Sequence, residues 1–288
     1  MKTDNLSGIR LRQAELEAWR SYILSRLEAG RQPAPADGWR PGPAVTISYQ
    51  TGSDAREIAE RLVGVLQEAE PKGTVPWTVF DRQLVEKVLE EHELPKALAK
   101  FMPEDRRSFI QDVMEELVGL RPPSWVMVPK IAETVLHLAN VGHVILVGRG
   151  ANFITARMPN VFHVRLIASL PKRIERVEIT NGLTPEEASK FVKYGDRSRS
   201  RYVKEHFHKS VDDDLFYDLT LNTDRIPLPD ATQLISDGAR RCFNWSGDEQ
   251  SSTPHASANW RCRQVIGADE TGRLALREGP EARRREMK

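Results

Sequence analysis

Short apolar strands alternate with amphipathic helices along the middle of the chain, and this alternation restricts the fold more than any other feature. The run 143–147 (HVILV) is the most apolar and is typical of a central strand, whereas 53–69 carries apolar side chains at helical spacing. Such alternation favours a mostly parallel sheet covered by helices on both faces, which is an α/β fold. The predicted strands are 44–48, 75–80, 143–147, 161–167 and 217–221, and the predicted helices are 53–69, 83–91, 96–101, 104–118 and 124–140.

The two ends of the chain differ in composition from this middle part. Residues 1–43 contain apolar side chains at helical spacing over 9–29, followed by a linker rich in proline and glycine that cannot continue a helix. The far end is rich in Ser, Arg and Glu, which is typical of a disordered tail. We therefore expect an N-terminal helical extension and linker over 1–43, one domain over 44–244 and a disordered tail over 245–288.

Charge and cysteine content argue against several classes of protein. The 288 residues carry 42 basic and 41 acidic side chains, and the net charge of +1 gives no support for a nucleic-acid partner. Two cysteines without metal-ligand spacing suggest neither a zinc site nor a disulfide scaffold, and favour the reducing cytosol. No apolar run approaches the roughly 20 residues of a membrane span, and no secretory signal is expected. We expect a cytoplasmic protein without a membrane partner or a resident metal site, and the sequence does not indicate its oligomeric state.

The first candidate site is the turn that follows Ser48. In parallel sheets ligands bind at the carboxyl ends of the strands, and a helix N-terminus directly after such an end favours a phosphate group. The turn does not match the pattern G-x-x-x-x-G-K-[ST], because Arg56 stands at the lysine position. An ordinary strand-to-helix turn is the alternative. The candidate residues of this turn are Thr51, Gly52, Ser53, Asp54, Ala55, Arg56 and Glu57.

The second candidate site is Arg149, which stands between Gly148 and Gly150 directly after the apolar run 143–147. The glycines let the backbone bend sharply, and the planar guanidinium suits a bidentate contact with a phosphate. The alternative is a tight turn with a solvated arginine. This turn is expected at the same edge of the sheet as the first.

The third candidate site is the segment 194–202, in which arginines alternate with other residues. They do not share one helical face, but a helix start or a mobile loop could direct Arg197 and Arg199 toward one anion. Phosphoryl transfer needs such charge around the migrating group. The alternative is a solvated basic helix with Asp196 as its N-cap.

Three shorter patterns concern single turns. Asp81 follows a predicted strand, where it could contact a substrate or cap a helix. The acidic triplet 212–214 is typical of a solvated loop, and metal binding is its alternative. Thr184, Pro185 and Glu187 predict a helix start with a capping box.

Taken in order, these segments resemble the cytidylate kinase-like family of nucleoside monophosphate kinases. VTISYQTGSDAREIAERL resembles the family's first strand–helix unit, VFDRQLV its second strand, and VILVGRGANFI with NVFHVRLIASLPKRIERV its third unit. GDRSRSRYVKEHF and YDLTLNTD resemble its lid and last strand. The similarity covers about 45–240. It implies a P-loop kinase-like fold with a helical lid, which transfers the γ-phosphoryl group of ATP, with Mg²⁺, to a nucleoside monophosphate such as CMP or dCMP.

The resemblance also implies roles for individual residues. By position in the family's motifs, Gly52, Ser53 and Arg56 would lie at the ATP phosphates, and Arg149 would hold the acceptor phosphate. The residues expected at the acceptor are Asp81, Arg149 and Gly150. The lid residues expected near the transferring phosphate are Asp196, Arg197 and Arg199. The only partners implied are nucleotide substrates.

Three positions depart from the family pattern. Asp54 and Ala55 stand where relatives have glycines, and Gly150 stands where relatives have Asp, which leaves the specificity for cytosine or ribose open. A carboxylate beside a polyphosphate repels it by about 1 kcal/mol or more, although Asp54 could instead cap the helix. Two functions therefore follow: an ATP-dependent nucleoside monophosphate kinase, or a catalytically degenerate nucleotide-binding or regulatory module on the same fold.

Overall fold

The chain divides into two units, residues 1–245 and 246–288. The computed structural model describes residues 41–70, 75–81, 127–148, 150–243, 267–268 and 274–275. The predicted helices at 9–29, 83–91, 96–101 and 104–118 lie outside these residues. The predicted division at 43 and 44 and at 244 and 245 stays a prediction.

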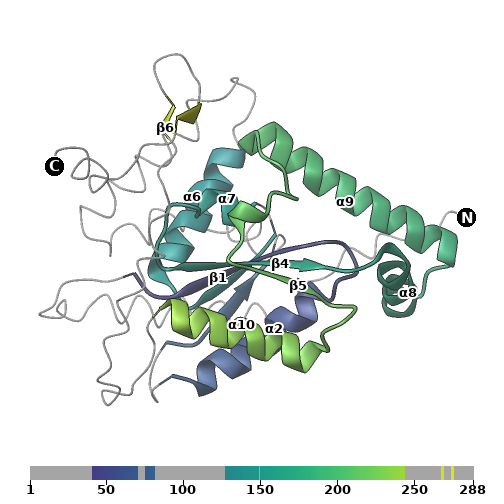
Figure 1. Cartoon of the computed structure of the whole chain (residues 1–288), viewed down its shortest axis with the longest axis horizontal. Coiled ribbons are helices and arrows are strands. Elements are labelled where there is room, and N and C mark those ends of the chain that lie inside the picture. Colours follow the sequence, from purple (N-terminus) through teal and green to yellow (C-terminus); the bar gives the residue numbers. More distant parts are fainter. Residues whose placement is uncertain are drawn as a thin grey trace, which may run out of the picture. The chain divides into compact units, whose positions relative to one another are not determined.

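A five-stranded parallel sheet forms the centre of the first unit. Its strands are β1 (Ala44–Tyr49), β2 (Thr78–Phe80), β3 (Val144–Val147), β4 (Val161–Ile167) and β5 (Leu219–Asn222). They lie in the order β2-β3-β1-β4-β5, so β1 pairs with β3 on one side and β4 on the other. Figure 1 shows β1, β4 and β5 of this sheet. All five strands therefore place their carboxyl ends at one edge, as the alternating sequence predicts.

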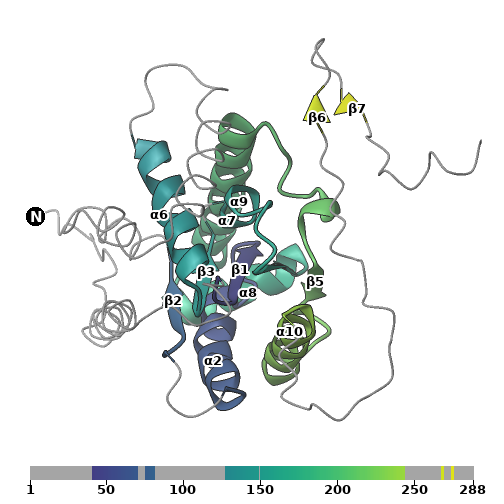
Figure 2. The ribbon, with the colours of Figure 1, turned by 90° about the vertical axis from the view of Figure 1, so that its left-hand side faces the viewer.

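Helices cover both faces of this sheet (Figure 2). On one face α2 (Ala55–Glu68) packs beside α10 (Leu228–Cys242). The other face is covered by α6 (Met127–Val141), the short α7 (Ala151–Ile154) and α9 (Pro185–Phe207). This three-layer arrangement is the P-loop kinase-like α/β fold that the sequence predicts.

The apolar run of β3 explains why the core has two halves. Val144 and Leu146 point into the cluster under α6, α7 and α9, while Ile145 and Val147 point into the cluster under α2 and α10. Successive side chains of a strand face opposite ways, so a strand buried on both faces cannot alternate apolar with polar residues. The run 143–147 is thus an interior strand, as predicted, with β1 in the middle of the sheet.

A helical hairpin follows β4 and consists of α8 (Leu170–Asn181) and α9. The Thr184 hydroxyl accepts from the Glu187 N–H, and the Glu187 carboxylate accepts from the Thr184 N–H at 3.0 Å, which confirms the predicted capping box. Pro185 occupies the first position of the helix, where its missing N–H costs nothing. The helix then runs without a break to Phe207, so Asp196 lies within it and is not an N-cap.

The second unit contains two short antiparallel strands, β6 (Gly267–Ala268) and β7 (Leu274–Ala275). Among the helices that the structure describes, none combines the length and the hydrophobicity needed to cross a membrane.

Candidate functional site

The turn between β1 and α2 has a fixed backbone conformation. Gly52 has φ 82°, and a Cβ there would come within 2.5 Å of the carbonyl oxygen of Arg173, so glycine is required. The N–H and hydroxyl of Ser53 both donate to the carbonyl of Gln50, at 3.1 and 2.7 Å. Asp54 follows in the left-handed region, at the N-cap of α2 but without a side-chain capping bond. The turn therefore presents its backbone rigidly at the carboxyl edge of the sheet.

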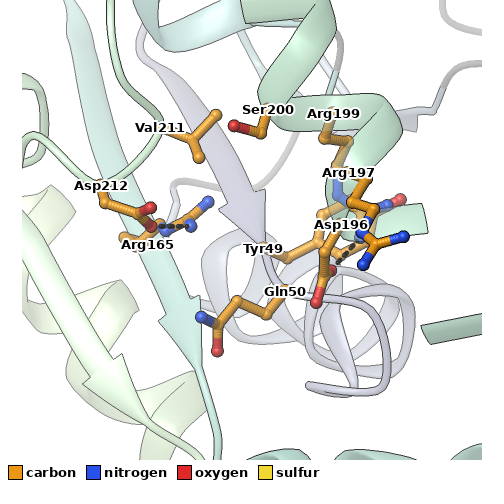
Figure 3. A pocket seen from close by; sticks show the side chains of 9 residues that line it. All are labelled: Tyr49, Gln50, Arg165, Asp196, Arg197, Arg199, Ser200, Val211 and Asp212. Carbon is orange, nitrogen blue, oxygen red and sulfur yellow. Dashed lines mark hydrogen bonds and ion pairs between the residues drawn. The ribbon is translucent and has the colours of Figure 1, made fainter. Parts of the chain in front are cut away.

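The carboxylate of Asp196, which comes from α9, lies against this turn (Figure 3). Its Oδ1 accepts from the N–H of Thr51 at 2.8 Å and from the Thr51 hydroxyl at 3.0 Å. Arg173 Nη1 donates to Oδ2 at 2.5 Å, and Arg199 Nη2 donates to Oδ1 at 2.6 Å. One anion thus receives a loop N–H, a hydroxyl and two guanidinium groups, which are the donors that phosphate sites use.

These donors decide the charge of Asp196. Burial by itself raises the pKa of the carboxyl, but the hydrogen bonds from Thr51, Arg173 and Arg199 outweigh burial and hold the pKa below its ordinary value of 3.8. The carboxylate is therefore ionised at neutral pH. It balances part of the positive charge that the two arginines bring to the turn.

The close approach of α9 to the turn depends on Gly195. A Cβ at this position would come within 2.5 Å of Thr51 Oγ1, so a side chain there would force either Thr51 or the helix to shift. Glycine inside a helix costs roughly 1 kcal/mol relative to alanine. At the residue directly before Asp196, glycine leaves the contact between Thr51 and the carboxylate undisturbed.

Arg173 and Arg176 of α8 also hold the turn, and the sequence analysis did not single them out. Arg173 is buried and its Nη1 donates to the carbonyl of Thr51 at 3.2 Å. Arg176 Nε pairs with the carboxylate of Asp54 at 3.1 Å, and its Nη1 donates to Thr223 at 2.8 Å. The spacing of three residues on a helix places both arginines on one face. This spacing, directly after a strand, is the signal that could have found them.

Asp54, which departs from the family pattern, has a compensating partner. Burial raises the pKa of its carboxyl above 3.8, Arg176 lowers it, and Glu57 raises it further. The ion pair with Arg176 keeps this carboxylate at the rim of the turn. The Arg176 guanidinium therefore balances part of the negative charge of Asp54.

Arg56 and Glu57 extend along the outer surface of α2. Arg56 Nε pairs with Glu60 at 3.0 Å, and Glu57 pairs with Arg61 at 3.0 Å, all with largely exposed side chains. Pairs of this kind contribute about 0.3–0.5 kcal/mol. Because Glu60 lies one turn further along the helix, this contact directs Arg56 away from the N-terminus of α2. Ser53 and Ala55 are buried beneath the turn.

A second arginine centre lies near the carboxyl end of β4. The Arg165 side chain is only 6% exposed, and its Nη1 donates to the Ser48 hydroxyl at 2.9 Å. Its Nη2 donates to Asp212 Oδ1 at 3.0 Å, and the guanidinium lies 5.7 Å from the centre of the Tyr217 ring. Arg165 was not among the predicted site residues because it stands inside a strand. The signal was a charged residue within the run VFHVRLI.

A cavity of about 220 Å³ is lined by residues of both centres (Figure 3). The guanidinium of Arg199 lies over the ring of Tyr49 at 4.6 Å, which orients it along the wall. Arg197 is exposed, and among the described residues it makes no hydrogen bond or ion pair. The lining includes Tyr49, Gln50, Arg165, Asp196, Arg197 and Arg199.

The other predicted site residues lie elsewhere at this edge or outside the described residues. Asp81 directly follows β2, and Gly150 is the N-cap of α7, three residues after the end of β3. Arg149 lies outside the described residues. Within the part of the chain that the structure describes, no three His, Cys, Asp or Glu side chains group as a metal site would require. In the acidic triplet, Asp212 pairs with Arg165, and Asp213 accepts from the N–H of Leu215.

Comparison with protein families gives one match, a model described as the cytidylate kinase-like family, over residues 44–225. No curated protein sequence matches the chain.

Similar solved structures include three proteins of low sequence identity. An uncharacterized protein from Eubacterium ventriosum ATCC 27560 is 17% identical, with a TM-score of 0.46 over 69% of this chain and 98% of that one. A gluconokinase from Sinorhizobium meliloti 1021 is 12% identical, with a TM-score of 0.36 over 72% and 97%. A shikimate kinase from Bacteroides thetaiotaomicron is 10% identical, with a TM-score of 0.38 over 70% and 98%.

Proposed function

Because the chain belongs to the cytidylate kinase-like family, we propose that it transfers the γ-phosphoryl group of ATP to a nucleoside monophosphate, with CMP or dCMP as the favoured acceptor. Family membership supports phosphoryl transfer in general, and the acceptor is the finer part of the proposal. The observation that carries it is the anion site at the turn, where four hydrogen bonds converge on the Asp196 carboxylate.

The residues of this anion site fit the phosphates of a donor nucleotide. The N–H and hydroxyl of Thr51, with Arg173 and Arg199, would bind phosphate oxygens in place of the Asp196 carboxylate. Mg²⁺ would supply positive charge at the phosphates, and it usually binds through one or two carboxylates together with phosphate oxygens. Asp54 on the turn and Asp196 on α9 are nearby carboxylates that could serve as such ligands.

The proposed chemistry needs charge and positioning rather than a strong base. The second pKa of a phosphate monoester is about 6, so an acceptor phosphate already carries a nucleophilic oxygen at neutral pH. That oxygen would bond to the γ-phosphorus as the bond to ADP breaks. Arg197 and Arg199 on α9 would stabilise the migrating group, and Arg149, with Asp81 and Gly150 at the same edge, would hold the acceptor.

A degenerate nucleotide-binding or regulatory module is the second candidate. It is favoured by the contact of Arg56 with Glu60, since this arginine stands at the position of the P-loop lysine and extends along α2 instead. Asp54 at the rim of the turn also adds negative charge where a polyphosphate would bind. In this case the chain would bind an anion at the turn but would not catalyse phosphoryl transfer.

A coupled assay with ATP and Mg²⁺ against CMP, dCMP, UMP, AMP and GMP separates the two candidates. We expect a nucleoside diphosphate from at least one acceptor. Arg149→Ala should slow transfer by about 100-fold or more, and Arg199→Ala should lower kcat more than it weakens ATP binding. Arg201→Ala, an exposed arginine of the same helix, is the matched control.

The outcomes of this assay are distinct. ATP binding without turnover on any acceptor would favour the regulatory module. Absence of ATP binding in a calorimetric titration would contradict both candidates. If Arg199→Ala lowers kcat and ATP affinity equally, Arg199 does not specifically stabilise the migrating phosphoryl group.

A further inference from the structure

Arg165 is a buried charge within an otherwise mainly apolar strand. Its neighbours in β4, Val164 and Leu166, are fully buried in the core, whereas its two terminal nitrogens donate to the Ser48 hydroxyl and to Asp212. The partner carboxylate of Asp212 is largely exposed, so this ion pair offsets little of the cost of burying the guanidinium. The stability of the fold therefore does not explain an arginine at this position. Binding of an anionic ligand in the adjoining cavity would explain it.

The sheet register fixes the position of this arginine. Ser48 of β1 lies directly opposite Arg165 of β4, so their side chains share one face of the sheet. The hydroxyl can then orient the guanidinium without any loop. Figure 3 places Arg165 across the cavity from Arg197 and Arg199, so cations line it from two sides.

The carboxylate partner of Arg165 is held much less firmly. The Asp212 side chain is 74% exposed, and it lies in the irregular segment between α9 and β5. An exposed carboxylate loses little when it returns to water, so another anion can replace it. Exchange at this position would leave the guanidinium and its serine partner in place.

We propose that Arg165 and Ser48 form a second oxyanion subsite, which binds the phosphate of the nucleoside monophosphate acceptor, and that Asp212 occupies it until the acceptor binds. The inference rests on the proposed kinase function and adds a residue to its acceptor side. A phosphate monoester carries a charge of roughly −1.5 to −2 at pH 7 and offers three acceptor oxygens. It can therefore accept from both Arg165 nitrogens and from the hydroxyl, whereas an uncharged acceptor has nothing to exchange for Asp212.

Calorimetric titration of CMP and of cytidine into the full chain, with and without ADP, tests the subsite independently of turnover. We expect wild type to bind CMP at least about tenfold more tightly than cytidine. Arg165→Met should lower CMP affinity by about fivefold while cytidine and ATP affinities stay within about twofold, because Arg149 would still contact the acceptor phosphate. Inorganic phosphate should compete with CMP more weakly in this variant than in wild type.

Asp212→Asn tests the exchange. Removing the competing charge should raise CMP affinity by about threefold to fivefold. Asp214→Asn makes the same change of charge at an exposed residue two positions further on and should leave CMP affinity unchanged. If Arg165→Met does not fold, as judged by circular dichroism and thermal unfolding, Ser48→Ala and Asp212→Asn carry the test.

The proposal is overturned if wild type does not distinguish CMP from cytidine, or if Arg165→Met binds CMP as tightly as wild type does. Failure of the proposed function looks different. In that case CMP affinity depends on Arg165 as expected, yet ATP is not bound or no phosphoryl group is transferred. Transfer at the wild-type rate by Arg165→Met would reject the subsite and leave the kinase function standing.

Discussion

The two arginine centres of the cavity hold their carboxylates in opposite ways. Asp196 is 29% exposed and receives hydrogen bonds from the backbone and hydroxyl of Thr51 and from two arginines. Asp212 is 74% exposed and receives one guanidinium hydrogen bond, from Arg165. Several surrounding groups therefore fix the Asp196 carboxylate in place. Asp212, by contrast, pairs with a guanidinium whose position the sheet sets independently of it.

This difference follows from the elements that build each centre. The first joins the turn after β1, α8 and α9, so it exists only while α9 lies against the turn. The second is built by neighbouring residues of β1 and β4, in register, and its carboxylate comes from an irregular segment. An anion can therefore replace Asp212 without moving a helix, whereas an anion that replaces Asp196 changes the contact between α9 and the turn.

The largest effect is expected from Arg173→Ala, which removes the most buried cation of the first centre. Asp196 would keep Thr51 and Arg199, so we expect the free energy of unfolding to fall by about 2–3 kcal/mol. With ATP bound at the turn as proposed, its affinity should fall by about 100-fold, since the proposed charge-assisted contact of Arg173 with the phosphates would be lost. Chemical unfolding and calorimetry measure both quantities.

If the two centres are separate, Arg173→Ala should leave the second centre, around Arg165, unchanged. CMP affinity should stay within about twofold of wild type in Arg173→Ala. Lys172→Ala, an exposed cation beside it that pairs with Glu175, is the matched control and should change neither affinity. Joint loss of ATP and CMP binding in a folded Arg173→Ala protein would mean that the two centres are one site.

A smaller effect is expected from Asp196→Asn. The amide keeps the shape but not the charge, so ATP without Mg²⁺ should bind about fivefold more tightly because no carboxylate competes for the arginines. Wild type should exceed the variant in unfolding free energy by about 1 kcal/mol at pH 7. Glu205→Gln, an exposed acid of the same helix, is the control for loss of one negative charge.

The pH dependence of this stability difference has a definite sign. Because the folded protein lowers the pKa of Asp196 below 3.8, its contribution is complete above that value and disappears as the pH falls through the lowered pKa. Urea unfolding from pH 7 down to pH 3 should therefore show wild type and Asp196→Asn converging at the acid end. If the difference in unfolding free energy stays constant over this range, the charge of Asp196 does not stabilise the contact between α9 and the turn.

The sheet and its helices could be predicted because their signals are local. The strand 161–167 matches β4, and the capping box at Thr184 is present as predicted. The alternative that placed Asp196 at the N-cap of a basic helix is wrong, because α9 runs without a break from Pro185 to Phe207. Local patterns fix where elements start when capping chemistry is present, and tertiary contacts decide the rest.

The pairings within the site could not be predicted in the same way. Thr51 and Asp196 stand 145 positions apart, and Ser48 and Arg165 stand 117 apart, so no spacing in the sequence reveals that they meet. The candidate turns were found because strand ends gather at one edge of a parallel sheet. Which arginine faces which carboxylate depends on sheet register and helix packing. For that reason Arg173 and Arg165 escaped the sequence analysis.

The smallest effect is expected from Asp54→Gly, which affects the first centre alone. Asp54 has φ 58°, a conformation that costs a side chain roughly 1 kcal/mol and that glycine adopts freely. Loss of the pair with Arg176 opposes this gain, but Arg176 keeps its bonds to Thr223. The two terms nearly cancel, so the unfolding free energy should change by less than about 1 kcal/mol.

The affinities should respond to Asp54→Gly more clearly than the stability does. Removing a carboxylate from the rim of the turn should tighten binding of ATP without Mg²⁺ by about threefold, with a smaller gain at high salt, because the repulsion is electrostatic. CMP affinity should not change, since Asp54 does not contact Arg165 or Ser48 in the described structure. Glu68→Gln, which removes an exposed charge at the far end of α2, controls for net charge. An equal increase in affinity for ATP and CMP would indicate a general electrostatic effect of the lost charge. No increase in either affinity would show that Arg176 already neutralises Asp54 and that the turn tolerates its departure from the family pattern.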